Sequence, residues 1–268
     1  MGADKTRDSK MDLGLKGRAA LVTGAARGIG KAEALALAAE GCAVAVNDID
    51  RAAADATVAE LRGRGVTAVA CIGDVSDEAG AETVVRAAHD GLGRLDILVN
   101  NAGAGGRHLG RPAEEMSVDD WDIIVRTHLR STFLCSKFAV PLMRAGGFGR
   151  IVNTSSMNVT GGGRPGVTNY SAAKAGVIGL TRTMAKEIGS AGITVNAIAP
   201  GYVETELIAG FSPEKRAVIT GQNPLGRFCR PGEVGALVAF LCSVQAAFIN
   251  GALVCMDGGK RDFFWGDQ

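Results

Sequence analysis

Short apolar runs alternate with helix-length segments along most of the chain. Within each run, apolar residues are nearly continuous rather than alternating with polar ones, which indicates strands buried on both faces. Parallel strands need long crossover connections, usually helices, so the pattern predicts an α/β fold whose parallel sheet is covered on both faces. The expected strands are Ala19–Thr23, Ala43–Val46, Thr67–Ile72, Leu95–Val99, Ile151–Asn153, Ile193–Ala199 and Ala252–Cys255. Ligands of such sheets bind beyond the carboxyl ends of the strands, so the functional residues should lie in the loops there.

The longest expected helix runs from Ser117 to about Arg144. Ser117 is a candidate N-cap, with Asp120 three residues later. Side chains that recur at helical spacing then predict one stripe facing inward. This stripe consists of Trp121, Ile124, Val125, His128, Leu129 and Thr132.

The chain has 268 residues and no internal repeat or low-complexity linker, so we expect a single domain. We place this domain at residues 14–259, between a polar N-terminal extension at 1–13 and a C-terminal tail at 260–268. The tail holds Phe263, Phe264 and Trp265. Because leaving three large aromatic side chains in water is unfavourable, we expect the tail to pack against protein in a neighbouring subunit, although chain ends are often disordered.

Composition excludes several classes of protein. The 29 Lys and Arg against 28 Asp and Glu give a net charge of +1, which argues against a nucleic-acid-binding protein. The start, MGADKTRDSK, has charges where a signal peptide needs an apolar run, so we expect a cytoplasmic protein. The uncharged segment Val234–Met256 is long enough to span a membrane, but its polar residues favour a helix, a turn and a strand. The 6 cysteines form no CxxC pair and no cluster with histidine, so we expect them to be mostly buried and expect no metal site.

A glycine-rich turn follows the first expected strand and leads into an Ala-rich helix. Its glycines allow a sharp turn and let a pyrophosphate approach the amides of a helix N-terminus. The spacing G-x-x-x-G-x-G departs from the commoner GxGxxG, and such a turn can also merely join a strand to a helix. Asp48, at the end of the second strand, supports a dinucleotide site because a carboxylate there can bind an adenosine ribose, although it can also cap a helix. The candidate cofactor residues here are Gly24, Arg27, Gly28, Ile29, Gly30 and Asp48.

Small or polar residues also follow the next two strands. Asp74 and Val75 come after the third strand, and Asn101, Ala102 and Gly103 come after the fourth. Turn formation alone can explain each group. Because the carboxyl ends of parallel strands lie at one edge of the sheet, these groups and the glycine-rich turn together favour one cofactor site.

A candidate catalytic set lies further along the chain. Ser156 follows the fifth strand, and Tyr170 and Lys174 lie at the start of the next helix. Side chains four residues apart share a helical face, so the ammonium can favour the phenolate and lower a pKa that is about 10 in free tyrosine. A lone Tyr-x-x-x-Lys pair arises by chance, but beside a dinucleotide loop and Ser156 it predicts a hydride-transfer site.

Together these motifs resemble those of the short-chain dehydrogenase/reductase family, over roughly residues 14–259. The matching segments are TGAARGIG at 23–30, Asp48, DV at 74–75, NNAG at 100–103, SS at 155–156, YSAAK at 170–174, NAIAPGYVET at 196–205 and DGG at 257–259. The resemblance implies a doubly wound, Rossmann-type sheet of about seven strands and a homotetramer. It implies that Tyr170 is the acid/base, that Ser156 orients the substrate oxygen, and that Lys174 holds the nicotinamide ribose and tunes Tyr170. It also implies that the nicotinamide end is lined by Pro200, Gly201, Val203 and Thr205.

Two features depart from the family pattern. The family usually has an asparagine as a fourth catalytic residue, in a pattern like W-x6-N-L, where this chain has His128. We expect His128 to replace that asparagine in a proton relay from Lys174 through water, because an imidazole can both donate and accept; an inward histidine can equally be a core residue. Ser156 precedes Tyr170 by fourteen residues, which looks one longer than the commonest spacing and indicates an altered substrate pocket.

These features predict an oxidoreductase that interconverts a secondary alcohol and a ketone with NAD(H). Asp48 favours NAD over NADP because a carboxylate repels the extra 2′-phosphate, although Arg27 and Arg51 are nearby cations. One alternative is an NADPH-dependent reductase of 3-oxoacyl thioesters. The alternative of another class is a non-catalytic dinucleotide-sensing or scaffold protein, since a fold does not by itself establish a function.

We expect a small-molecule substrate and no nucleic-acid or membrane partner. The pocket walls should come from the loops at 104–111, 157–168 and 202–227, and the last of these should form a lid. Arg107, His108 and Arg164 are candidates to receive an anionic substrate, although most surface arginines bind no ligand.

Overall fold

The computed structural model describes residues 11–161 and 163–259. Its centre is a seven-stranded sheet in the order β3-β2-β1-β4-β5-β6-β7, with every neighbouring pair parallel. The winding reverses between β1 and β4, so the expected doubly wound sheet is confirmed. The strands are β1 (Ala19–Thr23), β2 (Ala43–Asp48), β3 (Ala68–Ile72), β4 (Ile97–Asn100), β5 (Gly149–Thr154), β6 (Ile193–Pro200) and β7 (Leu253–Met256).

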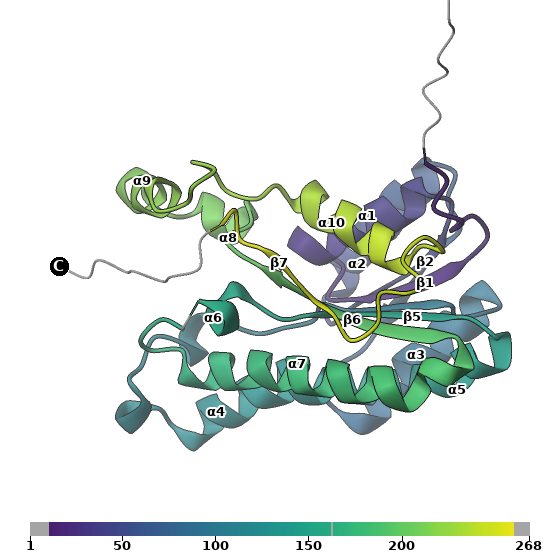
Figure 1. The fold of residues 1–268 in the computed structure, drawn as a ribbon, viewed down its shortest axis with the longest axis horizontal. Helices are drawn as coiled ribbons and strands as arrows, with labels where there is room; N and C mark the ends of the chain where they lie inside the picture. The colour runs from purple at the N-terminus through teal and green to yellow at the C-terminus, as the bar shows by residue number, and fades with distance from the viewer. Residues whose placement is uncertain (1–10, 162, 260–268) are drawn as a thin grey trace, which may run out of the picture.

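Helices cover both faces of the sheet (Figure 1). One face carries α1 (Gly28–Ala39), α2 (Arg51–Gly63) and α10 (Pro231–Cys242). The other carries α3 (Glu78–Leu92), α4 (Val118–Val125), α5 (Ser131–Gly146) and α7 (Thr168–Ile188). Three short helices, α6 (Met157–Thr160), α8 (Glu206–Ala209) and α9 (Pro213–Gly221), lie beyond the carboxyl ends of the strands, where they enclose the site described below.

The core has one large apolar cluster on each face of the sheet, because the strands are apolar at successive positions. Val22, Val99 and Val152 belong to the cluster under α1 and α10. Leu21, Leu98 and Ile151 belong to the cluster on the other face. Alternate residues of β1, β4 and β5 thus supply both clusters, which confirms that these strands are buried on both faces.

The expected long helix is interrupted. It begins after Ser117, whose Oγ accepts the Asp120 amide as predicted, but Arg126–Arg130 form a π-helical turn between α4 and α5. A π-turn inserts one residue, so positions on either side of it do not keep the spacing of one continuous α-helix. Trp121, which we expected to face inward, is 38% exposed, whereas Ile124 and His128 are buried.

The ends of the fold differ slightly from expectation. Leu13 was placed in the polar extension, but it packs against the core and its carbonyl accepts the Val244 amide at 3.1 Å. Fixed structure therefore begins before residue 14. The segment Val234–Met256 divides into α10, a turn and β7, as predicted. Phe263, Phe264 and Trp265 lie outside the described residues.

Two further expectations from composition can be compared with the structure. Cys42, Cys71, Cys135 and Cys242 are buried, as expected for small apolar residues, while Cys229 is half-buried and Cys255 exposed. Within residues 11–161 and 163–259, no helix is long and apolar enough to cross a membrane.

Candidate active site

A cavity of about 810 Å³ lies at the carboxyl ends of the strands. Its walls include the ends of β1, β2 and β4, represented by Gly24, Asp48 and Asn101. They also include Thr154 at the end of β5 and Gly201 just after β6. The cavity thus includes the crevice between β1 and β4, where doubly wound sheets bind ligands.

The glycine-rich turn forms a tight cradle at one end of this cavity. Gly24 has φ of +63°, and a Cβ there would lie 3.0 Å from the Ala102 Cα. A Cβ on Gly30 would lie 2.3 Å from the Gly24 carbonyl oxygen, so this residue must be glycine for the helix to approach the turn. No side chain caps the N-terminus of α1, which leaves its first amides and positive dipole end available to an anion.

Asp48 lies beside this cradle at the end of β2. Its Oδ2 accepts the Ala26 amide at 3.3 Å and its Oδ1 accepts the Asp50 amide at 3.1 Å. Arg27, the nearest candidate cation, forms an ion pair with Asp50. The Asp50 side chain, rather than Asp48, caps α2 through the Ala53 amide. Helix capping therefore does not explain Asp48, and its carboxylate faces the cavity.

The end of β4 is joined to the glycine-rich turn by side-chain hydrogen bonds. The Asn101 Nδ2 donates to the carbonyls of Thr23 and Gly24 at 3.0 and 3.1 Å. The Thr23 hydroxyl oxygen accepts the amides of Asn101 and Ala102 at 3.0 and 3.1 Å. Asn101 therefore fixes the shape of the cradle in addition to lining the cavity.

Ser156, Tyr170 and Lys174 meet at the other end of the cavity. Ser156 follows β5 and begins α6, while Tyr170 and Lys174 lie one turn apart on α7. The Lys174 Nζ donates to the Thr154 carbonyl at 2.6 Å and lies 5.6 Å from the centre of the Tyr170 ring. The three residues expected to form the catalytic set are thus brought together.

Burial dominates the ionisation of Tyr170. It raises the pKa of the phenol, while a hydrogen bond from Ser156 and the charge of Arg164 act in the lowering direction. Because the desolvation of a buried phenolate is the largest of these effects, the pKa of Tyr170 lies above that of a free tyrosine.

A buried carboxyl group that sequence reasoning missed lies on α1. Glu33 is 0% exposed, and neither of its carboxyl oxygens has a hydrogen-bond partner among the described residues. Burial raises its pKa to about 8, against the opposing charge of Lys174. Burial also lowers the pKa of Lys174 to about 7, and Glu33 acts in the raising direction. The two groups are thus electrostatically coupled, so each favours the charged form of the other.

His128 lies in the π-helical turn and faces the loop after β4. Its Nε2 lies 2.7 Å from the Ala104 carbonyl oxygen and also accepts the Ala104 amide at 3.1 Å, while Nδ1 is buried without a partner in the described part of the chain. Burial and the charge of Lys174 lower its pKa to about 3, so the ring is neutral. Its ring packs edge-on against Tyr170 at 5.1 Å. A Cβ on Gly103 would lie 2.3 Å from this ring, which explains the glycine there.

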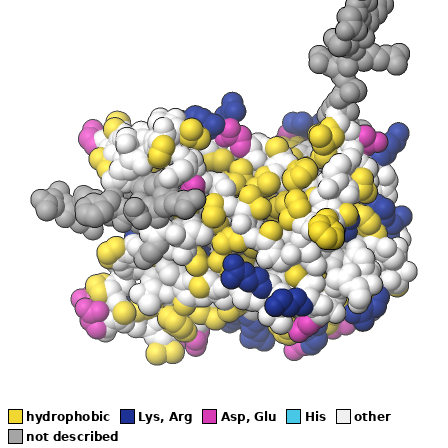
Figure 2. Space-filling view, in the orientation of Figure 1, with side chains coloured by type: hydrophobic (Ala, Val, Ile, Leu, Met, Phe, Trp, Pro, Cys, Tyr) yellow, Lys and Arg dark blue, Asp and Glu magenta, His cyan; other side chains and the backbone are white. Residues whose placement is uncertain are grey.

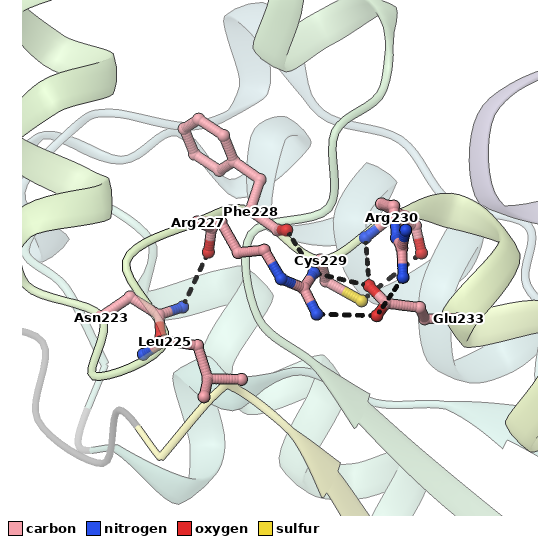
Figure 3. A network of polar contacts seen from close by, with 7 residues as sticks. All are labelled: Asn223, Leu225, Arg227, Phe228, Cys229, Arg230 and Glu233. Carbon is pink, nitrogen blue, oxygen red and sulfur yellow. Dashed lines mark hydrogen bonds and ion pairs between the residues drawn. The ribbon is translucent and has the colours of Figure 1, made fainter.

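The predicted lid at 202–227 contains α8 and α9 and has its own small cluster of Ile208, Ile219 and Phe228. Its base is held by Glu233, whose carboxylate accepts Arg227 at 2.7 and 2.8 Å and the Arg230 side chain at 3.1 Å (Figure 3). These arginines hold the pKa of Glu233 far below its usual range. The lid is thus anchored to the start of α10 by charge-assisted hydrogen bonds.

Most of the predicted cofactor residues line the cavity. Gly28, Gly30 and Pro200 do not; Gly30 packs on Gly24, and Pro200 is the last residue of β6. The predicted residues that do line it are Gly24, Arg27, Ile29, Asp48, Asp74, Val75, Asn101, Ala102, Gly103, Gly201, Val203 and Thr205.

Several lining residues were not predicted individually, because their side chains are ordinary apolar residues of loops. They include Leu109, Val167, Leu207, Ile208 and Phe211. Only the general position of the loops after the strands could have indicated them.

Comparison with known proteins agrees with this geometry. A family model described as enoyl-(acyl carrier protein) reductase matches residues 24–261. The chain is 43% identical over 252 residues to a 3-oxoacyl-[acyl-carrier-protein] reductase of Synechocystis sp., covering 93% of this chain and 99% of that protein. It is 42% identical over 242 residues to a cis-4-hydroxycyclohexanecarboxylate dehydrogenase of Sinomonas cyclohexanicum, covering 90% and 96%. A solved structure of a candidate short-chain alcohol dehydrogenase from Sinorhizobium meliloti superposes with a TM-score of 0.88 at 40% identity, covering 93% and 98%.

Proposed function

Because the chain belongs to the short-chain dehydrogenase/reductase family of oxidoreductases, we propose that it interconverts a secondary alcohol and a ketone with NAD(H). The observation that carries this proposal is the meeting of Ser156, Tyr170 and Lys174 at the closed end of a cavity whose other end is a glycine cradle. A proton-transfer group and a dinucleotide site in one cavity are what this reaction requires.

The residues present fit a nicotinamide dinucleotide. The cradle of Gly24 and Gly30 leaves room that a Cβ would fill, and the uncapped N-terminus of α1 suits a pyrophosphate. Asp48 would bind the adenosine ribose, and Lys174 would hold the nicotinamide ribose. When bound, the cofactor supplies the hydride acceptor or donor.

The protein's own part in the reaction is the handling of a proton. In the oxidation direction Tyr170 accepts the hydroxyl proton at its Oη, and in reduction it returns that proton. Ser156, which hydrogen-bonds to Tyr170, would orient the substrate oxygen beside it. Since burial raises the pKa of Tyr170, the phenolate needs the positive charge of Lys174, which Glu33 would favour only when its own carboxyl group is ionised.

We propose that His128 takes the place of the family's asparagine. Its Nε2 contacts both the carbonyl and the amide of Ala104, which fixes the loop after β4 against the π-helical turn. Its Nδ1 would accept a hydrogen bond from a water that bridges to Lys174. A neutral imidazole can thus both position the loop after β4 and take part in a proton relay.

NAD rather than NADP is supported by the charges at the end of β2. Asp48 faces the cavity, and Arg27 is already paired with Asp50. A 2′-phosphate would therefore meet a carboxylate without a nearby free arginine from the glycine turn. Repulsion of two like charges in a partly buried site is worth on the order of a few kcal/mol.

The experiment that tests this function measures the formation of reduced cofactor from NAD or NADP with a panel of secondary alcohols. Binding of each cofactor is measured in parallel by calorimetry. Turnover with NAD supports the proposal. Tight binding without any turnover would favour the non-catalytic alternative, and activity confined to NADPH and an acetoacetyl thioester would favour the 3-oxoacyl reductase.

We also propose a homotetramer, because large apolar side chains are exposed on two separate faces. Trp121 and Phe133 are exposed along α4 and α5. On the face in Figure 2, hydrophobic side chains gather over α10 and β7, where Phe240 and Phe248 are exposed. Two such faces can build a tetramer from two kinds of twofold contact. Light scattering should give four times the mass of one chain, and a monomer would contradict this proposal.

A further inference from the structure

The chain has three cations that could receive an anionic substrate, and the structure separates them. His108 is paired with Asp120, with its Nδ1 2.7 Å from the carboxylate. Arg107 is exposed and does not line the cavity. Arg164 is half-buried and does line it, together with Tyr170 and Tyr202.

Arg164 lies in the segment 163–167, which leads into α7 and is held in place by backbone contacts. The Gly110 amide donates to the Gly166 carbonyl at 2.6 Å. Gly166 has φ of +78°, and a Cβ there would lie 2.9 Å from the Gly110 carbonyl carbon. The segment therefore lies directly against the loop after β4, at a distance that only a glycine permits.

A buried asparagine joins the loop after β4 and the start of α4 to the catalytic helix. Asn169 is 0% exposed, and its Nδ2 donates to the carbonyls of His108 and Asp120 at 3.0 and 3.1 Å. Its Oδ1 accepts the Tyr170 amide at 2.8 Å. The loop after β4, the start of α4 and Tyr170 are thus joined through one side chain. These contacts fix the position of the segment that holds Arg164 relative to Tyr170.

Arg164 shares the wall of the cavity with acidic, polar and apolar side chains. Among the described residues, the acidic side chains that line the cavity are Asp48 and Asp74, at the ends of β2 and just after β3. The walls near the lid are supplied by Leu109, Val167 and Phe211. The charge of Arg164 is felt at the catalytic end, since it acts against the burial that raises the pKa of both Tyr170 and Tyr202.

We propose that the substrate is a secondary alcohol that carries a carboxylate, and that Arg164 receives this carboxylate. This inference rests on the proposed function. A guanidinium binds a carboxylate through charge-assisted hydrogen bonds in a preferred geometry, so one such contact both selects an anion and orients it. With the carboxylate held at Arg164, the carbinol carbon is turned toward Ser156 and Tyr170. Arg164 is a specificity-determining residue and takes no part in the proton transfer.

The test compares 4-hydroxycyclohexanecarboxylate with its methyl ester, which have the same carbinol but differ in charge. For the acid, Arg164→Gln should raise KM by about tenfold to a hundredfold, because it removes a charged hydrogen-bond partner, with kcat changed by less than about threefold. For the ester, both parameters should stay near those of the unaltered protein. Arg164→Lys should recover part of the affinity for the acid. Arg107 lies on the neighbouring loop but outside the cavity, so Arg107→Gln should leave kcat and KM unchanged for both substrates.

A binding measurement keeps this test independent of turnover. Cyclohexanecarboxylate, which cannot be oxidised at a carbinol, is titrated by calorimetry into the protein saturated with NADH. If Arg164→Gln binds cyclohexanecarboxylate at least about tenfold more weakly than the unaltered protein, the carboxylate site is supported. This holds even if the protein oxidises no alcohol, a result that would refute only the proposed function. Equal affinity of Arg164→Gln and the unaltered protein for cyclohexanecarboxylate would overturn the carboxylate site. So would an equal rise in KM for the acid and the ester. Either result would leave the proposed function standing. Melting curves confirm that each variant is folded.

Discussion

The two ends of the cavity are built in different ways. The cofactor end is made of backbone: glycines in close contact, the first amides of α1, and side chains such as Thr23 and Asn101 that hold the turn in shape. The substrate end is made of side chains, from the segment 163–167, the loop after β4 and the lid. A backbone cradle tolerates little change of sequence, whereas a wall of apolar side chains can be exchanged without disturbing the sheet. The first end therefore indicates the class of reaction, and only the second can indicate the substrate.

The stability of the two ends differs as well. The cofactor end rests on the large cluster that contains Val22, Val44 and Leu37. The lid rests on Ile208, Ile219 and Phe228 and is tied down at Glu233. Because few buried apolar contacts mean a low cost of local opening, we expect the lid to open for substrate while the cofactor end stays fixed.

The largest expected effect comes from Tyr170, which lies where the two ends meet. Tyr170→Phe removes only the hydroxyl that carries the proton, so turnover should fall by about 10²- to 10⁴-fold. The affinity for NAD should change little, because the cradle is untouched. Steady-state kinetics and cofactor titration measure the two quantities. Tyr202→Phe alters the other tyrosine of the cavity and should lose far less activity; near-native turnover in Tyr170→Phe would show that the proton donor is another group.

His128 tests whether the boundary between the two ends is catalytic or merely packed. His128→Leu removes the bond to Ala104 and the Nδ1 acceptor, so turnover should fall about tenfold or more, while His128→Asn should retain much of it. Because the pKa of His128 is lowered to about 3, the ring is neutral at every working pH, and neither variant should remove a step in the pH profile between about 5 and 8. Native turnover in His128→Leu would make this residue a packing group alone.

Asp48 tests the preference of the cofactor end for NAD over NADP. Asp48→Ser removes the carboxylate that would oppose a 2′-phosphate, so the ratio of kcat/KM for NAD over NADP should fall by about tenfold to a hundredfold. Asp55→Ser alters an exposed aspartate of α2 and should leave the ratio unchanged. Equal efficiency with both cofactors in the unaltered protein would refute the assignment of Asp48.

Glu33, the buried carboxyl group on α1, gives the smallest expected effect. Its pKa is raised to about 8 in the folded protein, above the value of 4.5 for a free glutamate, so the folded state holds a proton that the unfolded state has lost. The contribution of Glu33 to stability is therefore fully present below about pH 4.5 and is lost as the pH rises through 8. Glu33→Gln, which is neutral at any pH, should melt several degrees higher than the unaltered protein at pH 9 and at nearly the same temperature at pH 5.

Two observations would contradict the account of Glu33. One is a difference in melting temperature between Glu33→Gln and the unaltered protein that does not depend on pH. The other is an equal gain in Glu187→Gln, which alters an exposed carboxylate on α7.

The contrast between the two ends also explains what the sequence could predict. All seven strands and the glycine cradle can be predicted because continuous apolar runs and closely spaced glycines are local signals. The π-helical turn at Arg126–Arg130 and the exposure of Trp121 have no such local signal. Glu33 looks like an ordinary polar residue of an Ala-rich helix. The sequence does not distinguish Arg164 from Arg107 and His108, because the contact between Gly110 and Gly166 that brings segment 163–167 to the cavity joins residues far apart in the chain.

In the proposed reaction, hydride leaves a carbinol carbon for the cofactor while Tyr170 takes the hydroxyl proton. The most direct test incubates the protein with NAD and a secondary alcohol deuterated at the carbinol carbon, and measures deuterium in the reduced cofactor by mass spectrometry. The account predicts one deuterium per molecule of NADH formed, and almost no labelled NADH with Tyr170→Phe over the same time. Reduced cofactor without deuterium, or equal labelling by both proteins, would contradict it.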